Sequence, residues 1–125
     1  MARIDYAPGD LNPPHTNPRG TEMIFELEGE LDVEFKTTTN VLISKHSMKG
    51  ENFVFPRCFV HFQKNNDKVP AAVVFGFNSQ LLGTQVIAIT LFGAMPPVPD
   101  NVLTKAFQID VIEVEKFKSK FAPKK

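Results

Sequence analysis

The chain has 125 residues, 42% of them hydrophobic, which is enough to bury the core of one domain and too few for two independently folded domains. Its 14 Lys and Arg residues equal its 14 Asp and Glu residues, and this zero net charge argues against general electrostatic capture of nucleic acid or of an anionic membrane surface. The longest apolar run, at residues 86–95, is about half of the roughly 20 residues that span a bilayer, so we expect no transmembrane helix.

The start of the chain is predicted to be extended or turned. Residues 7–20 hold four prolines and two glycines, which exclude a helix there. Residues 1–5 carry charges where a signal peptide would have its apolar stretch, so the chain as given is expected to contain no secretory signal.

Between residues 25 and 35, hydrophobic side chains alternate with acidic ones. A period of two predicts β structure. Gly29 stands at the centre of this segment and can take a positive φ, so we expect a tight turn between two strands. The acids on the alternate face fit a solvated sheet face, although a functional acidic surface would show the same pattern. They are Glu26, Glu28, Glu30, Asp32 and Glu34.

Further short strands are predicted along the chain, separated by turn residues. They cover residues 41–45, 52–55, 59–63, 71–77 and 85–91. Short strands at even spacing indicate a sandwich, a barrel or a jelly roll. The proline-rich stretch at 95–99 predicts a stiff connector. We therefore divide the chain into a β module at residues 1–95, which would carry a metal site, and a helical segment at residues 96–125.

Two short helices are predicted in the C-terminal segment. Asp100 is expected to cap a helix from Asn101 to about Phe107. Asp110 and Glu113 have the spacing of a capping box that begins a second helix. Five lysines between residues 116 and 125 follow, where cations suit the helix dipole. They could bind an acidic partner, but a basic tail at a helix end explains them more simply.

Four polar residues could form a metal site. His15 and Asn17 are two residues apart, so on extended backbone their side chains point to the same side. The turn residues at 18–20 would let the carboxylate of Glu22 return to the same centre, and His61 lies on a later predicted strand. Two imidazoles, a carboxylate and an amide oxygen suit manganese, iron or zinc rather than thiolate-loving metals. The alternative is that these polar residues near turns only contact solvent.

Two segments resemble the two cupin boxes of the germin and germin-like proteins. The first box has the spacing of Gly9, His15, Asn17, Glu22 and Gly29. The second has the spacing of Gly50, Pro56, Cys58, His61 and Asn65. The resemblance extends from Arg3 to about Phe121.

This resemblance implies an all-β fold, a cupin double-sheet jelly-roll barrel that is N-terminally incomplete here and carries short C-terminal helices. It implies manganese held inside the barrel by His15, Glu22 and His61. Asn17 stands where the family has a further histidine, and its amide oxygen is a poor ligand for a transition metal. Manganese is therefore expected to be weakly bound or absent.

The resemblance also implies a function. Germin-like proteins are typically secreted to the plant cell wall, glycosylated and assembled as hexamers, and some are oxalate oxidases or superoxide dismutases. We expect a manganese-binding extracellular protein of the apoplast that forms a homo-oligomer and binds neither nucleic acid nor membranes. The alternatives are a manganese oxidoreductase of the superoxide dismutase or oxalate oxidase type, and a non-catalytic module for small-ligand binding or nutrient storage.

Three residues have an unusual setting in this reading. Cys58, the only cysteine, stands where the family has a glycine, which suggests a positive φ that costs on the order of 1 kcal/mol. Glu26 shares a strand face with Glu22, so it either points into the barrel as a substitute ligand or acceptor, or is moved among the solvated acids by a bulge, which we favour. His46 is expected on a surface loop without a partner.

The family resemblance begins at Arg3. Germin-like precursors have a signal peptide, a disulfide-bearing segment and early strands before that point, and without them we expect unpaired edges on the sheet.

Overall fold

The computed structural model describes residues 1–123 and divides into two compact units, Met1–Thr84 and the part from Gln85 onward. The division expected after residue 95 falls inside the second unit, beyond its first helix. Lys124 and Lys125, the last two lysines of the predicted basic tail, lie outside the described residues.

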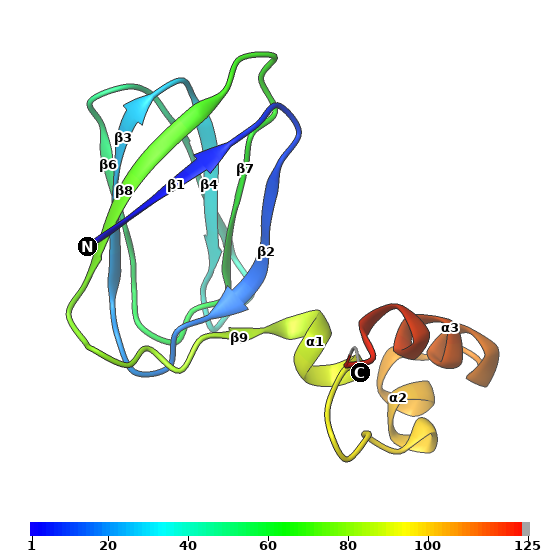
Figure 1. The fold of residues 1–125 in the computed structure, drawn as a ribbon. Coiled ribbons are helices and arrows are strands. Elements are labelled where there is room, and N and C mark those ends of the chain that lie inside the picture. The colour runs from blue at the N-terminus through cyan, green and yellow to red at the C-terminus, as the bar shows by residue number, and fades with distance from the viewer. Residues whose placement is uncertain (124–125) are drawn as a thin grey trace. The chain divides into compact units, whose positions relative to one another are not determined.

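The first unit consists of two antiparallel sheets that face each other (Figure 1). One sheet has the order β1-β8-β3-β6, and the other has the order β5-β4-β7-β2 within this unit. The strands are β1 (Ala2–Tyr6), β2 (Leu11–Thr16), β3 (Glu22–Glu28), β4 (Leu31–Lys36), β5 (Leu42–Ser47), β6 (Asn52–Phe55), β7 (His61–Lys64) and β8 (Ala71–Phe77). The two-layer β architecture predicted from the sequence is therefore confirmed.

The predicted break at Gly29 is present, but it does not make a hairpin. Gly29 has a φ of 70° and separates β3 from β4, as expected. These two strands lie in different sheets, because β3 pairs with β6 and β8 whereas β4 pairs with β5 and β7. The turn therefore carries the chain from one layer of the barrel to the other.

The second unit is mainly helical. It contains β9 (Gln85–Val86), α1 (Ile87–Phe92), α2 (Asp100–Phe107) and α3 (Val111–Phe121). The strand predicted at residues 85–91 is wrong beyond Val86. Its β-branched residues favour a strand, but residues 87–92 form a helix. In this helix the ring of Phe92 packs against those of Phe107 and Phe117, at centroid distances of 5.5 and 5.3 Å.

The helix starts were predicted with mixed success. The side chain of Asp110 accepts a hydrogen bond from the Glu113 backbone N–H at 2.9 Å, which confirms the expected cap of α3. Asp100 is not the cap of α2: Pro99 takes that position, and Asp100 lies in the first turn, where its carboxylate pairs with Lys118. No helix in residues 1–123 is long and apolar enough to cross a membrane.

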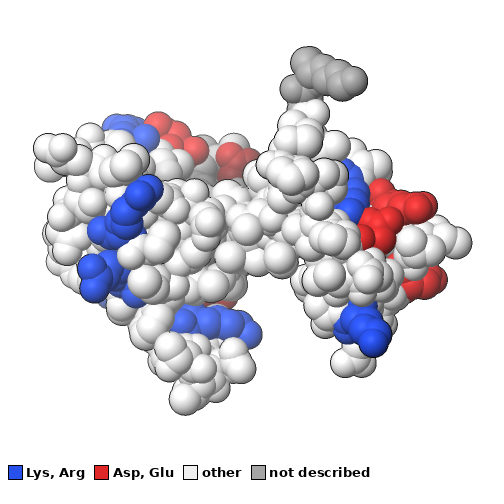
Figure 2. Space-filling model, turned by 90° about the horizontal axis from the view of Figure 1, so that it is seen from below, with Lys and Arg blue, Asp and Glu red and all other residues white. Residues whose placement is uncertain are grey.

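The space between the two sheets holds an apolar core and a set of buried polar groups. The apolar part contains Tyr6, Ile24, Leu31, Val33, Phe55, Ala71 and Val73. The buried polar residues include His15, Asn17, Glu22, Glu26, Ser47, His61 and Gln63. Charged side chains of both signs appear on the outer face in Figure 2, with wide uncharged areas between them.

We predict that Gly29→Ala destabilises the fold more than Gly50→Ala. Both glycines have a positive φ, 70° and 88°. A Cβ at Gly29 would collide with the backbone carbonyl of Pro70, whereas nothing lies within 4 Å of one at Gly50. Urea unfolding should show a loss of about 1 kcal/mol for Gly50→Ala and at least about 2 kcal/mol for Gly29→Ala. Equal losses would contradict the role given to Pro70.

Candidate metal centre

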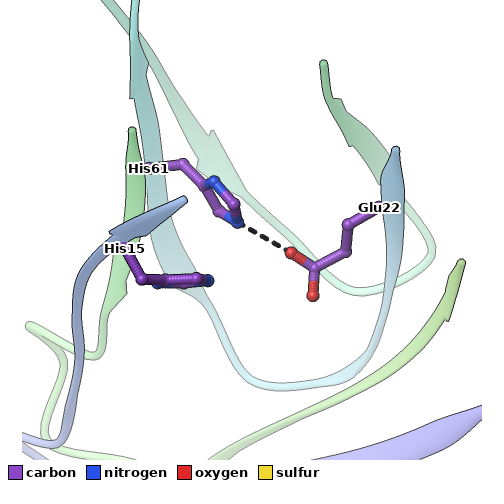
Figure 3. A group of neighbouring side chains, drawn as sticks. All are labelled: His15, Glu22 and His61. Atoms are coloured by element: carbon purple, nitrogen blue, oxygen red, sulfur yellow. Dashed lines mark hydrogen bonds and ion pairs between the residues drawn. The ribbon is translucent and has the colours of Figure 1, made fainter. Parts of the chain in front are cut away.

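His15, Glu22 and His61 meet inside the barrel, as the sequence predicted (Figure 3). His15 on β2 and His61 on β7 are opposite each other in the register of one sheet, and Glu22 begins β3 in the facing sheet. One ligand atom from each residue lies within 4.8 Å of the others, and all three side chains are buried. The cluster therefore joins two strands of one sheet to one strand of the other.

Backbone carbonyls fix the orientation of both imidazoles. Nδ1 of His15 lies 2.8 Å from the carbonyl oxygen of Pro13, and Nδ1 of His61 lies 3.0 Å from that of Phe59. A carbonyl can only accept, so each Nδ1 carries the hydrogen. In its neutral form, each ring then has its lone pair on Nε2. This is the usual arrangement behind a metal-binding histidine.

The contact between His61 and Glu22 requires a proton or a metal cation between the two atoms. Nε2 of His61 lies 2.9 Å from Oε2 of Glu22 in a buried setting. A neutral ring with its hydrogen on Nδ1 and an ionised carboxylate would both present lone pairs at this distance. A proton on either atom, Nε2 or Oε2, or a metal cation between the groups removes the repulsion. Two imidazole nitrogens and a carboxylate oxygen suit manganese, iron or zinc, so the donor set fits a metal ion.

His15 is held in the form that can bind a cation. Burial lowers the pKa of its imidazole, and the neighbouring His61 lowers it further, against the hydrogen bond with Pro13. The ring is therefore neutral at neutral pH, and metal ligands must be deprotonated. The His15 and His61 rings lie 4.0 Å apart, and Phe55 stacks on His61 at 4.3 Å, so aromatic packing restrains the rings.

Asn17 is buried, and its polar groups have partners in the protein. Its side-chain Oδ1 accepts a hydrogen bond from the Thr84 hydroxyl at 2.7 Å, and its backbone carbonyl accepts one from the Cys58 N–H at 3.2 Å. Cys58 has a φ of 74°, which confirms the positive φ expected at this position. Its exposed thiol contacts the Pro18 carbonyl oxygen at 3.5 Å.

A second group of polar side chains lies between the sheets and was not singled out from the sequence. Oε1 of Gln63 accepts hydrogen bonds from Asn12 at 2.7 Å and from the Tyr6 hydroxyl at 3.4 Å. Nε2 of Gln63 has no hydrogen-bond partner among residues 1–123. The signal for Gln63 was its position two residues after His61, which gives both side chains the same face of β7.

The favoured interpretation of Glu26 was wrong. The bulge in the pairing of β3 with β8 lies between Glu26 and Glu28, so it leaves Glu26 inside the barrel and puts Glu28 outside. Glu26 is 0% exposed. It is four residues from Glu22 along the strand, roughly 13 Å, and the cluster of three does not include it.

The comparisons with known proteins agree with this architecture. The sequence profile of the cupin family matches residues 1–115. The chain belongs to the cupin family. Among solved structures, recombinant oxalate oxidase in complex with glycolate is similar to this cupin with a TM-score of 0.92 and 46% identity, covering 96% of this chain and 61% of that one. The expected cupin double-sheet jelly roll with short C-terminal helices is thereby confirmed.

Curated relatives confirm the resemblance to germin-like proteins. The "Germin-like protein subfamily 2 member 4" of Arabidopsis thaliana is 68% identical over 126 residues, and the "Rhicadhesin receptor" of Pisum sativum is 72% identical over 125 residues. Both alignments cover 100% of this cupin but only 57% and 58% of the relatives. The chain therefore spans somewhat more than half of their length.

The prediction for His46 was partly wrong. The residue is exposed, as expected, but it lies in β5 and has two partners. Its Nδ1 is 2.7 Å from Oδ1 of Asp32, and its Nε2 is 2.9 Å from Oε2 of Glu30. The sequence did not reveal this because Asp32 reaches His46 only through the register of β4 with β5. Hydrogen bonds to Asp32 and then to Glu30 raise the pKa of His46 to about 9.

We predict that His46→Gln lowers stability at low pH only. The folded pKa of about 9 exceeds the ordinary value of 6.5, so the charged ring stabilises the fold fully below pH 6.5 and loses this contribution as the pH rises through 9. The effect should be small because the His46 side chain is 52% exposed. Urea midpoints should differ from wild type at pH 6 and coincide at about pH 10. A difference of the same size at both pH values would refute the pairing.

Proposed function

We propose that this cupin is a germin-like extracellular protein that binds one divalent cation, manganese, through His15, Glu22 and His61. The observation that carries the proposal is the buried cluster itself, in which one ligand atom from each of the three residues lies within 4.8 Å of the others. Both imidazoles have Nδ1 engaged by a backbone carbonyl, which leaves Nε2 as the donor atom toward the centre.

The residues of the site would contribute different kinds of ligand. His15 and His61 would supply nitrogen donors, and Glu22 would supply negative charge from the opposite sheet. Asn17 would take the fourth position as a weak, neutral oxygen donor, with Thr84 holding its side chain. A bound manganese ion would supply Lewis-acid or one-electron redox chemistry. With one weak ligand out of four, affinity should be lower than with three histidines.

The relatives support a proposal on location and assembly. We propose secretion to the apoplast and assembly into a homo-oligomer, because the chain is 68% identical to a germin-like protein over its whole length. Nucleic-acid and membrane partners are not part of the proposal, since the 14 basic and 14 acidic residues leave no net charge to attract polyanions.

A second candidate function is a manganese oxidoreductase that acts on a small carboxylate or on superoxide. The likeness to an oxalate oxidase bound to glycolate favours it. So does Nε2 of Gln63, a buried N–H donor without a partner among residues 1–123, which could donate to a substrate oxygen. Turnover of oxalate or superoxide by the manganese-loaded protein, and none by the metal-free protein, would establish this activity. A folded protein that takes up no metal would instead favour the binding or storage module.

Metal binding is tested directly with purified protein. We predict about one manganese ion per chain by elemental analysis and a weakening of Mn²⁺ binding of about a hundredfold or more in His61→Ala, because loss of a ligand should exceed the effect of losing a supporting hydrogen bond. His46→Ala is the matched control, since it removes an exposed histidine. Equal Mn²⁺ binding by His61→Ala and the wild type, with both folded by circular dichroism, would refute the site.

The role of Asn17 is tested by restoring an imidazole. Asn17→His is expected to strengthen Mn²⁺ binding by about tenfold or more, because imidazole is a much better donor than an amide oxygen. Competition against a fluorescent chelator measures the change. Asn17→Ala is the control, because it also breaks the hydrogen bond with Thr84 but adds no donor. If Asn17→His and Asn17→Ala bind Mn²⁺ alike, the fourth position does not contribute.

A further inference from the structure

Glu26 is a second carboxyl group inside the barrel, and the metal cluster does not account for it. Its side chain is 0% exposed, and neither carboxylate oxygen has a hydrogen-bond partner among residues 1–123. The hydroxyl of Ser47 on β5 is also fully buried and also lacks a partner in this part of the chain. Buried polar groups almost always have partners, so this pair calls for a functional explanation.

The position of Glu26 is fixed by the sheet. Glu26 is opposite Val73 of β8, and its backbone N–H donates to the carbonyl of Glu51 at 2.9 Å. Glu22, Ile24 and Glu26 alternate with outward residues along β3, so all three side chains face the interior. Ionised Glu26 would therefore be an uncompensated charge in a largely apolar setting, which is costly.

The groups around Glu26 do not neutralise it. The residue opposite Glu26 on β8, Val73, is aliphatic, and so are the buried Leu31 and Val33 of the facing sheet. The titratable groups on its own strand and on the neighbouring elements include Tyr6, Glu22, His61, which contacts Glu22, the exposed Glu28, Lys45, His46 and Glu51. Of these, Lys45 pairs with Glu51 at 3.3 Å, and His46 pairs with Glu30 and Asp32 outside the barrel. No cation in residues 1–123 forms an ion pair with Glu26.

Burial raises the pKa of Glu26 to about 7, although the nearby Ser47 hydroxyl and the charge of His46 act in the opposite direction. The carboxyl is therefore a mixture of acid and carboxylate near neutral pH. A change in local charge can shift this balance at low cost.

Glu22 and Glu26 act on the same neighbour. Burial raises the pKa of the Tyr6 hydroxyl, and the charges of Glu22 and Glu26 both raise it further. This hydroxyl bonds to Gln63 on the opposite sheet. Glu22 and Glu26 lie four residues apart on the same face of β3, roughly 13 Å, a distance over which a charge at Glu22 can still act on a buried carboxyl group.

We propose that Glu26 and Ser47 form a second polar centre of the barrel, in which Glu26 releases a proton when a divalent cation enters at His15, Glu22 and His61. This inference rests on the proposed metal-binding function. The O–H bond of Glu26 breaks, its electron pair stays on the carboxylate, and the proton goes to solvent. No redox change is involved. The new negative charge, together with that of Glu22, balances the two positive charges of the ion.

The experiment measures proton release when Mn²⁺ binds. Calorimetric titrations at pH 6.5 in two buffers of different ionisation enthalpy give the number of protons released per ion. Glu26→Gln should release about 0.3 to 1 fewer proton than wild type. It should also bind Mn²⁺ about three- to tenfold more weakly than wild type at pH 8, where Glu26 is ionised, with little difference at pH 5.5.

Glu28→Gln is the matched control, because it removes the same charge from the same strand at an exposed position. It should leave proton release and affinity as in wild type. Ser47→Ala should move the pH dependence of binding to higher pH, because the hydroxyl lowers the pKa of Glu26. A similar loss in Glu28→Gln and Glu26→Gln would mean that overall charge, and not the interior centre, is responsible.

The pH dependence of stability of the metal-free protein provides an independent test. The folded pKa of about 7 lies above the ordinary 4.5, so the folded state holds the proton more tightly and stability should fall as the pH rises from 4.5 to 7. Over this range the urea midpoint of wild type should fall relative to that of Glu26→Gln.

The possible failures are distinguishable. If wild type binds Mn²⁺ and Glu26→Gln matches it in proton release and affinity, the inference about Glu26 is overturned and the proposed function stands. If wild type binds no Mn²⁺, both are overturned.

Discussion

The structure depends on one electrostatic constraint. A histidine nitrogen and a carboxylate oxygen approach each other at 2.9 Å where water does not reach them. The carbonyl at Nδ1 of His61 keeps the ring hydrogen on the far side, so the pair is stable only with a proton or a metal cation between the two atoms. Three features of the fold position the pair. The strand register places His15 beside His61, the Phe55 ring stacks on His61, and the facing sheet carries Glu22.

The meeting of His15, Glu22 and His61 and much of the fold could be predicted from the sequence. The box spacing pointed to His15, Glu22 and His61, and alternation in residues 25–35 pointed to β structure. Such patterns are local, or are fixed by a family resemblance. His46 and its carboxylate partners could not be predicted, because the contact depends on how β4 and β5 align. The helix at residues 87–92 was missed because its β-branched residues favour a strand. In the structure, Phe92 at its end packs against Phe117, a contact between residues far apart in the sequence.

Glu26 shows where a pattern alone misleads. Alternation between hydrophobic and acidic residues suggested that every acid in the segment faces solvent, yet the inward face of β3 carries Glu22, Ile24 and Glu26. The bulge expected to reverse the alternation is present, but it comes after Glu26. The position of a bulge depends on the partner strand, which is distant in sequence. The same residue then provides a chemical group that the cluster alone would not have suggested.

The three residues of the cluster come from two different sheets, which affects how the distances between them are set. His15 and His61 belong to neighbouring strands joined by backbone hydrogen bonds, so the spacing between them is set by one sheet. Glu22 belongs to the opposite layer, so its separation from the imidazoles is set by how far apart the two layers are held. An ion bound by all three residues would cross-link the two sheets. The packing of aromatic side chains between the sheets sets their separation, and the Phe35 and Phe53 rings are one such pair, with centroids 5.8 Å apart. This packing would therefore determine how well the three residues fit around an ion.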